Sequence, residues 1–349
     1  MNRVGFVVLL SACSVLVADL AAAAPPGTVR VASVLETVPT GVTGDTADDP
    51  AIWVNSRAPS ASLVITNEKK VGRLTVFNLA GQVVQQITEP GGFYGNVDVR
   101  GDIVAAANNG IWTWRVSGTA TTPALVLARE ATGNAVTAGE GLCMWDPGAA
   151  GVAGGLYAIN VARTTFRVRV HPLTDSDNDG LLLVGKPVRD FYLPSEGEGC
   201  EVDDATGALY LAEEDAGIWR FDLKAPASPA PPGTMIARVG PELSPDVEGL
   251  ALADGVLYAS SQNVAAPRNN WLTRYNAGTG AYLGSTRITD GTMSDDCDQT
   301  DGIDAYGGNL GAQFPQGLFV CQDGFNDSPG SSGTQNFKYT PLHLLDGIA

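Results

Sequence analysis

Residues 196–221 read EGEGCEVDDATGALYLAEEDAGIWRF, and this stretch contains the pattern that decides the fold. An acidic, glycine-containing loop at 196–199 comes first. The apolar run Leu209–Glu213 follows, and a polar loop separates it from the alternating run Ile218–Phe221. Short apolar runs between Gly, Asn and Asp are typical of sequential antiparallel strands. The stretch therefore predicts a strand–loop–strand unit with an acidic loop before it.

The same unit recurs along the chain at a spacing of roughly 50 residues. The six acidic loops are Asp48-Asp49-Pro50, Asn96-Val97-Asp98, Gly139-Glu140-Gly141, Glu196-Gly197-Glu198-Gly199, Asp246-Val247-Glu248-Gly249 and Asp301-Gly302-Ile303-Asp304. Repeated units of three or four short strands predict an all-β fold, a six-bladed β-propeller. A β-sandwich is the alternative, but it would not repeat its loops in this way.

The repeated loops predict a metal site. In an up-and-down blade, the loop before the first strand and the loop between the second and third strands lie at the same end. Carboxylates crowded at one mouth of a channel repel each other unless they are protonated or bridged by cations. Many oxygen ligands, with only two histidines in the chain, favour calcium over zinc or iron. A single Asp-Gly pair is ordinary turn chemistry, whereas an acid in every unit indicates a ligand set.

A separate acidic segment, Asp175-Ser-Asp177-Asn-Asp179-Gly180, has the acid spacing of the first half of an EF-hand loop. Its twelfth position is Lys186 rather than Glu, and its flanks resemble strands. A true EF-hand is therefore excluded, while a peripheral calcium site and a solvated turn both remain open.

The amino-terminal residues predict export. Arg3 precedes a nearly continuous apolar run, Val4–Ala18, and small residues at 21–24 offer a cleavage site. A membrane anchor is a weak alternative because Asp19 interrupts a run shorter than a spanning helix needs. A lipoprotein acylated at Cys13 is a minor alternative.

We therefore expect removal of residues 1–24 and a single domain over residues 25–349, secreted or released into the periplasm. The formal net charge is −17, and loss of the signal removes one arginine and one aspartate. Such an acidic chain is not expected to bind nucleic acid, whose phosphates require a basic surface. Bound divalent cations would let it hold an anionic substrate.

Four cysteines remain after residue 24, and they allow three disulfide connectivities. Cys297 and Cys321 flank channel-side loops of the last unit, and Cys143 and Cys200 lie beside the entry loops of neighbouring units. We predict the pairs Cys297–Cys321 and Cys143–Cys200. Four buried thiols are the alternative, which an oxidising compartment disfavours.

The ordered loops resemble those of the β-propeller phytases, the calcium-dependent alkaline phytases of bacteria. The matching stretches include Asp48-Asp49-Pro-Ala-Ile-Trp53, Asn67-Glu-Lys-Lys70, Asn96-Val-Asp98, Leu209-Tyr-Leu-Ala-Glu-Glu-Asp215, Asp246-Val-Glu248-Gly249, Thr300-Asp-Gly-Ile-Asp304 and Gln322-Asp-Gly324. The resemblance extends from about residue 45 to the C-terminus. The single motifs are weak, but their order and spacing are specific.

The resemblance implies a calcium-dependent phosphoric monoester hydrolase, similar to a 3-phytase, that acts on myo-inositol hexakisphosphate with several Ca²⁺ ions at the channel mouth. The ligands that it implies are Asp48, Asp49, Asp98, Glu198, Glu213, Glu214, Asp246, Glu248, Gln262 and Asp304. The catalytic residues would be Glu214, which polarises the attacking water, with Glu213 and Lys69. Lys69, Lys70 and Arg163 would bind substrate phosphate.

Three positions depart from the family pattern. An expected arginine is missing where Asn109-Gly110 leads directly into Ile111. An expected tyrosine corresponds to Glu140, and an expected lysine–glutamate pair corresponds to Arg163-Thr164. These changes leave the calcium ligands in place and concern the affinity for substrate.

Two other functions remain as alternatives. One is a non-catalytic propeller that keeps structural calcium and binds a partner. The other is a calcium-dependent propeller of the lactonase or esterase type, whose products would be acids and not orthophosphate. We expect a monomer that acts on a small molecule and does not span a membrane.

Overall fold

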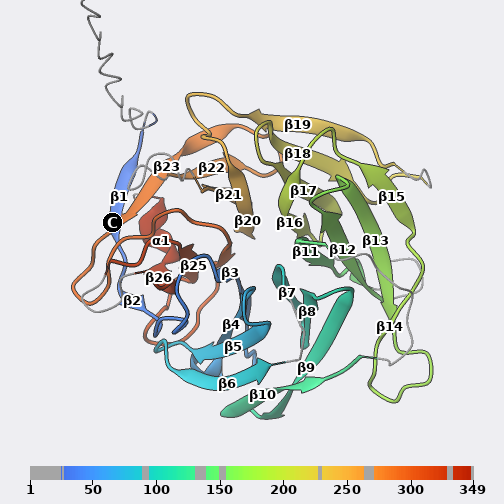
Figure 1. Ribbon diagram of the computed structural model, residues 1–349, viewed down its shortest axis with the longest axis horizontal. Coiled ribbons are helices and arrows are strands. Elements are labelled where there is room, and N and C mark those ends of the chain that lie inside the picture. Colours follow the sequence, from blue (N-terminus) through green and yellow to red (C-terminus); the bar gives the residue numbers. More distant parts are fainter. Residues whose placement is uncertain are drawn as a thin grey trace, which may run out of the picture.

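The structure is a computed structural model that describes residues 25, 27–88, 94–129, 139–148, 155–226, 230–262, 271–327 and 333–346. Its strands form six sheets around a central axis, which confirms the predicted six-bladed β-propeller (Figure 1). The predicted signal segment, with Cys13, lies outside the described residues. None of the described helices is long and apolar enough to cross a membrane.

Each blade begins with the strand nearest the axis. Blade 1 contains β3 (Ala47–Trp53), β4 (Leu63–Glu68), β5 (Arg73–Asn78) and β6 (Val83–Thr88), with the 3-10 turn η1 (Pro59–Ala61) between β3 and β4. Blade 2 contains β7 (Val97–Arg100), β8 (Ile103–Ala107), β9 (Ile111–Thr119) and β10 (Thr122–Leu127). Blade 3 contains β11 (Gly141–Trp145), β12 (Leu156–Ala162), β13 (Arg167–Thr174), β14 (Leu183–Val184) and β15 (Arg189–Tyr192).

The second half of the ring has the same plan. Blade 4 contains β16 (Gly197–Asp203), β17 (Ala208–Glu213), β18 (Gly217–Asp222) and β19 (Gly233–Arg238). Blade 5 contains β20 (Val247–Ala253), β21 (Val256–Ser261), β22 (Leu272–Asn276) and β23 (Tyr282–Thr289). Blade 6 contains β24 (Ile303–Tyr306), β25 (Leu318–Asp323) and β26 (Asn336–Pro341), followed by the short helix α1 (Leu342–Leu345).

The amino-terminal strands close the ring, a feature that the sequence repeats do not reveal. β2 (Leu35–Glu36) pairs with β26 and supplies the outer strand of blade 6, and β1 (Val29–Ala32) adds a parallel strand to β23. The buried ammonium group of Lys338 on β26 lies 2.7 Å from Glu36 Oε2 on β2 and 3.0 Å from Asp323 Oδ2 on β25. This ion pair therefore joins the first and last parts of the described chain.

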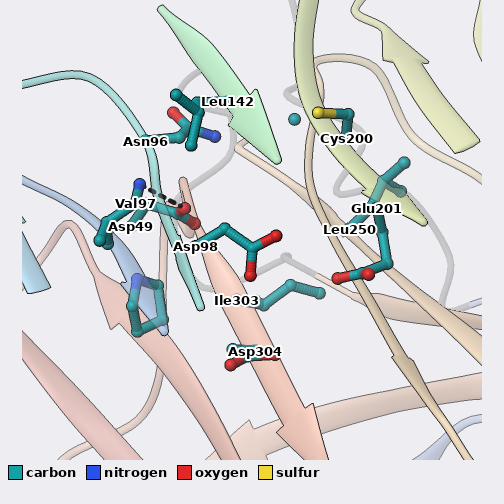
Figure 2. Close-up of a pocket in the computed structure, with 12 residues that line it drawn as sticks. Asp49, Asn96, Val97, Asp98, Leu142, Cys200, Glu201, Leu250, Ile303 and Asp304 are labelled. Atoms are coloured by element: carbon teal, nitrogen blue, oxygen red, sulfur yellow. Dashed lines mark hydrogen bonds between the residues drawn. The ribbon is translucent and has the colours of Figure 1, made fainter. Parts of the chain in front are cut away.

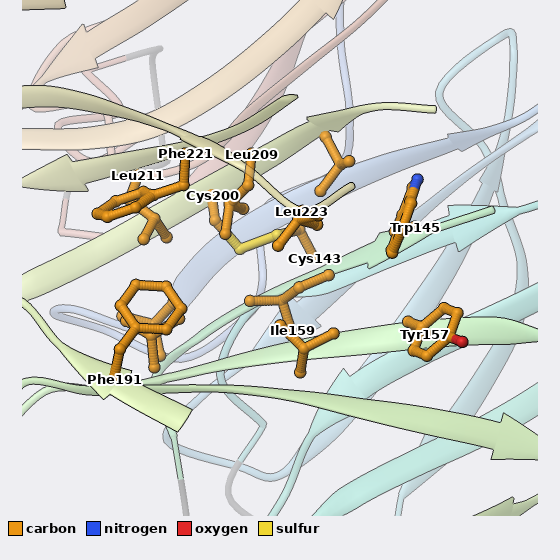
Figure 3. Close-up of a cluster of buried hydrophobic side chains, with 14 of the residues drawn as sticks. Cys143, Trp145, Tyr157, Ile159, Phe191, Cys200, Leu209, Leu211, Phe221 and Leu223 are labelled. Carbon is orange, nitrogen blue, oxygen red and sulfur yellow. A yellow bond between two sulfur atoms is a disulfide. The ribbon is translucent and has the colours of Figure 1, made fainter. Parts of the chain in front are cut away.

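Apolar side chains fill the interfaces between neighbouring blades. Between blades 3 and 4 the ring centroids of Phe191 and Phe221 lie 4.9 Å apart, beside the disulfide Cys143–Cys200 (Figure 3). The Cα atoms of the two cysteines are 5.6 Å apart. Equivalent clusters lie between the other neighbouring blades. Because each sheet has apolar side chains on both faces, it becomes buried only when the ring is complete.

The structure confirms both predicted disulfides. Cys143–Cys200 joins the first strands of blades 3 and 4, and Cys297–Cys321 joins the loop before β24 to β25, with Cα atoms 6.6 Å apart. Both pairs belong to buried interface clusters. Each bond therefore fixes a segment close to an acidic entry loop.

Candidate metal centre

The two sets of loops meet at one mouth of the channel, as the sequence predicts. Lys69 follows β4, and its ammonium nitrogen lies 3.0 Å from Asp48 Oδ1, at the start of β3, and 2.8 Å from Asp301 Oδ2, in the loop before β24. Arg163 follows β12 and contacts the entry loops of blades 3 and 4. Turns between second and third strands thus lie beside the acidic entry loops.

Irregular pairing at the start of three inner strands places acids at this mouth. The register shifts within Ala47–Pro50, Gly197–Cys200 and Val247–Leu250, at equivalent places in blades 1, 4 and 5. A β-bulge adds a residue to one strand and turns side chains in a new direction. These shifts contain the acids Asp48, Asp49, Glu198 and Glu248.

Glycines after two of these acids let neighbouring loops approach. A Cβ atom on Gly199 would lie 2.4 Å from the carbonyl oxygen of Glu248, and one on Gly249 would lie 2.7 Å from that of Asp301. The Gly249 N–H donates to the same Asp301 oxygen at 3.0 Å. The Glu-Gly pairs therefore supply a carboxylate and a close backbone contact with the next blade.

Three glutamates from blade 4 converge at the mouth. Glu196, Glu198 and Glu214 each offer a carboxylate oxygen, and these oxygens lie within 4.8 Å of one another. Arg163 from blade 3 contacts all three and also Glu140, with its Nη1 3.1 Å from Glu140 Oε1. This group, called here the glutamate cluster, contains four acids and one base.

Glu198 provides the test of whether a cation fits. Its side chain is 8% exposed, and its buried Oε1 accepts no hydrogen bond, although Arg163 Nε lies 3.4 Å away. Burial, with the neighbouring charges of Glu248 and Glu140, raises the pKa of Glu198 to about 11. A buried oxygen of this kind needs a proton or a cation. The oxygen-only donor set fits calcium.

A second acidic group lies on the side of blades 1 and 6. Asp48 and Asp301 share the ammonium group of Lys69, which is also 3.5 Å from Asp45 Oδ1. Burial raises the pKa of Glu248, and the charges of Asp301 and Glu214 add to this effect. Glu248 therefore interacts electrostatically with members of both this group and the glutamate cluster.

Other candidate residues have different surroundings. Glu213 is buried, and its carboxylate accepts hydrogen bonds from Ser195 Oγ at 2.6 Å and Trp219 Nε1 at 2.8 Å. Burial raises the pKa of Glu214, and the charge of the nearby Asp246 adds to this effect. The backbone carbonyl of Asp246 accepts the N–H of Gln262 at 2.9 Å. Lys70 is exposed on the same turn as Lys69.

Asp49, Asp98 and Asp304 line the channel below the mouth, together with Glu201 (Figure 2). They border a cavity of about 10 Å³, close to the minimum that holds one water molecule. Asp49 Oδ2 accepts the N–H of Val97 at 3.2 Å. Burial, followed by the charges of Asp48 and Asp304, raises the pKa of Asp49 well above its usual range.

Arg100 binds two acids that line this cavity, Asp98 and Glu201, and it also binds Asp204. Its guanidinium lies 2.8 Å from Asp98, 2.6 Å from Glu201 and 3.1 Å from Asp204. Asp304 accepts the N–H groups of Ile52 and Ala305 at 2.6 and 2.7 Å. Asp98 and Asp304, which the sequence groups with the mouth ligands, thus lie in a separate channel group.

Sequence reasoning did not select Glu196, Glu201 or Asp301 as site residues. Glu196 and Asp301 lie in two of the six predicted acidic loops, so their position in the repeat is a signal that points to the site. Glu201 lies within β16, where an acid of an inner strand can face either the channel or a neighbouring sheet. Its position became clear only from its contact with Arg100.

The EF-hand-like segment lies between β13 and β14 of blade 3. Asp175, Asp177 and Asp179 bring carboxylate oxygens within 4.8 Å of one another. Asp175 Oδ2 accepts the N–H of Gly180 at 3.0 Å, and Asp179 Oδ1 accepts that of Leu181 at 2.8 Å. The segment forms a turn of its own.

The raised pKa values predict how the ion-free protein responds to pH. Burial raises the pKa of Asp301 and of Asp304 to about 7 and that of Glu201 to about 8, whereas an unfolded chain releases these protons near pH 4. Between about pH 5 and about pH 8 the folded state therefore binds more protons than the unfolded state, and stability falls as pH rises. Melting in excess chelator should show a falling Tm across this range, with a smaller fall in calcium. A chelated Tm that stays constant or rises would contradict these pKa directions.

The family model and the curated relative that this chain matches belong to one enzyme family. The chain matches the family model described as Phytase over residues 2–138 and 153–345. It is 32% identical over 329 residues to a 3-phytase of Bacillus subtilis (strain 168), with 88% of this chain and 82% of the relative covered. Among solved structures it is similar to the β-propeller domain of Myceliophteria thermophila Cps50 (Swd1), at 11% identity and a TM-score of 0.45 over 83% of this chain and 82% of the other. The fold assignment rests on the six sheets themselves.

Proposed function

The chain belongs to the phytase family and is a phosphoric monoester hydrolase that acts on phytate, and we propose that this activity depends on several calcium ions held at the acidic mouth. The observation that supports calcium most directly is the buried Oε1 of Glu198, which accepts no hydrogen bond and lies among the oxygens of Glu196 and Glu214. A divalent cation would offset these charges and let an acidic protein bind a polyanion.

The proposed ligands come from three groups of residues. The glutamate cluster supplies Glu198 and Glu214, and Asp246, Glu248 and Gln262 extend it along blade 5. Asp48 lies beside Lys69 on blade 1. Asp49, Asp98 and Asp304 belong to the channel, and Glu213, the last proposed ligand, directly precedes Glu214 in the chain. When bound, calcium supplies Lewis acidity and lowers the pKa of a coordinated water.

The chain's own residues have distinct roles in this proposal. Glu214 is 15% exposed and adjoins the mouth, so it can accept a hydrogen bond from the attacking water and hold it in position. Lys69, Lys70 and Arg163 supply the positive charges that hold phosphate groups. Glu213, already bonded to Ser195 and Trp219, fixes the strand end from which Glu214 projects.

We predict that calcium controls both stability and activity. Binding to the folded state alone stabilises a protein by about 2.7 kcal/mol when the free ligand is a hundredfold above its Kd. Melting and phosphate release from calcium phytate should be measured with calcium and with excess chelator, using magnesium as the matched control cation. Identical Tm and identical phosphate release in all three conditions would overturn the calcium proposal.

We also propose that the working form is a monomer made of residues 25–349, exported after removal of the signal segment. Two disulfides support an oxidising destination. Amino-terminal sequencing of the exported protein and its mass in solution test this proposal. A protein that retains residues 1–24, or one lipidated at Cys13, would refute it.

A further inference from the structure

Arg163 and Glu140 form a charged pair at the edge of the glutamate cluster. Arg163 lies on the turn between β12 and β13, and Glu140 directly precedes β11, so both belong to blade 3. The Arg163 side chain is 47% exposed, while that of Glu140 is 17% exposed. Arg163 thus contacts four carboxylates at a proposed calcium site, where its positive charge affects how an ion binds.

The contacts of Arg163 divide into two sets. Its Nη1 lies 3.1 Å from Glu140 Oε1 of the same blade. Its Nε contacts Glu196 and lies 3.4 Å from Glu198 Oε1, and its Nη2 lies 3.7 Å from Glu214 Oε1. One end of the guanidinium is therefore bound within blade 3, and the rest faces the three oxygens of blade 4 that can hold a metal ion.

A guanidinium in this position and an ion on those oxygens exclude each other. Calcium–oxygen bonds are about 2.3–2.6 Å long, so an ion shared by Glu198 and Glu214 would lie within a few ångströms of the Arg163 nitrogens. Positive charges this close repel each other strongly near a protein surface, and a calcium ion carries two of them. The side chain must therefore leave the oxygens of Glu198 and Glu214 when an ion binds them.

We propose that Arg163 is a movable counter-cation that competes with calcium for Glu198 and Glu214 and turns toward a substrate phosphate when calcium binds. Glu140 is the pivot, because it holds Nη1 and is not one of the three acids grouped around the ion position. Calcium and phosphate binding are then coupled through Arg163, and each favours the other. The inference rests on the proposed calcium dependence.

Calcium titration without substrate tests the competition. Arg163→Met and Arg163→Gln remove the competing charge, and Lys186→Met, which changes an exposed lysine, is the matched control. In calorimetry, the calcium-binding step that is absent from the Glu198→Gln variant identifies the site at the mouth. We expect this step to become about tenfold tighter in both Arg163 variants, because several partly exposed pairs are lost together, and to stay unchanged in the control.

The possible results separate this inference from the proposed function. If the wild-type protein shows no calcium step that Glu198→Gln removes, the proposed calcium centre fails. If that step exists but is equally tight or weaker in Arg163→Met and Arg163→Gln, the competition is refuted while the calcium centre stands. The melting curve of each Arg163 variant shows whether that variant is folded.

A double-mutant cycle tests the pivot. Glu140→Gln should raise KM for calcium phytate in the wild-type background, because Arg163 loses the contact that keeps it near the substrate. In the Arg163→Met background the same change should leave KM unchanged, since the residue through which Glu140 acts is gone. Equal effects of Glu140→Gln in the two backgrounds would refute the pivot.

Discussion

Replacing Glu214 with glutamine should lower kcat on calcium phytate by about 10²–10⁴-fold, the range that a positioned acid or base contributes. Glutamine has nearly the same shape and keeps a hydrogen-bonding oxygen, but it lacks the charge and cannot take a proton. The backbone contacts of Glu214 do not depend on the side chain: its N–H donates to Glu196 O at 3.2 Å, and its carbonyl accepts the Val247 N–H at 3.0 Å. The fold should therefore remain intact.

The kinetic pattern distinguishes this role from binding. A residue that acts on the reacting water lowers kcat and kcat/KM together, whereas one that only holds substrate raises KM. Calcium must be saturating, because Glu214 is also a proposed ligand. The exposed Glu242 offers a matched control for the same chemical change. If Glu214→Gln turned over like the wild type, this mouth of the channel would not be the place of cleavage.

Replacing Lys69 with methionine should act mainly on substrate affinity, with KM raised by about 10- to 100-fold, the equivalent of one hydrogen bond to a charged group. Burial disfavours the charge of Lys69, but Asp48 and Asp301 raise its pKa, so the residue stays protonated. Its side chain is 11% exposed. The neighbouring Lys70 is exposed, and Lys70→Met should have a smaller effect on KM.

The same change should also reveal the link between Lys69 and calcium. Without the ammonium group, Asp48 and Asp301 lose their counter-charge, and breaking a buried pair costs about 3–5 kcal/mol. We expect Lys69→Met to lower Tm strongly in chelator and much less in saturating calcium, where a cation offsets the same carboxylates. Lys186→Met is the control in both conditions. An equal loss of Tm with and without calcium would contradict this account.

Local sequence properties were sufficient for the architecture. Apolar runs such as Leu209–Glu213 form strands because alternate side chains face neighbouring blades, and the acidic loops recur because each blade enters the ring at the same end. The positions of four cysteines relative to these loops were enough to predict both disulfides. Closure by Leu35–Glu36 was not predictable, because a two-residue strand that pairs with the opposite end of the chain has no periodicity of its own.

The direction of each acidic side chain was decided by tertiary structure. Successive residues of a strand face opposite sides, and a shift of one residue reverses them. Glu213 thus points inward to Ser195 and Trp219, while its neighbour Glu214 reaches the mouth.

The start of β24 separates the two acids of the segment 301–304. Asp301 binds Lys69 at the mouth, whereas Asp304, three positions later, lines the channel. The sequence determined that carboxylates would gather at the axis of a propeller, because acid and strand recur together in every unit. Which carboxylates share a cation depends on bulges and on contacts between blades, and these exist only when all six sheets pack around the axis.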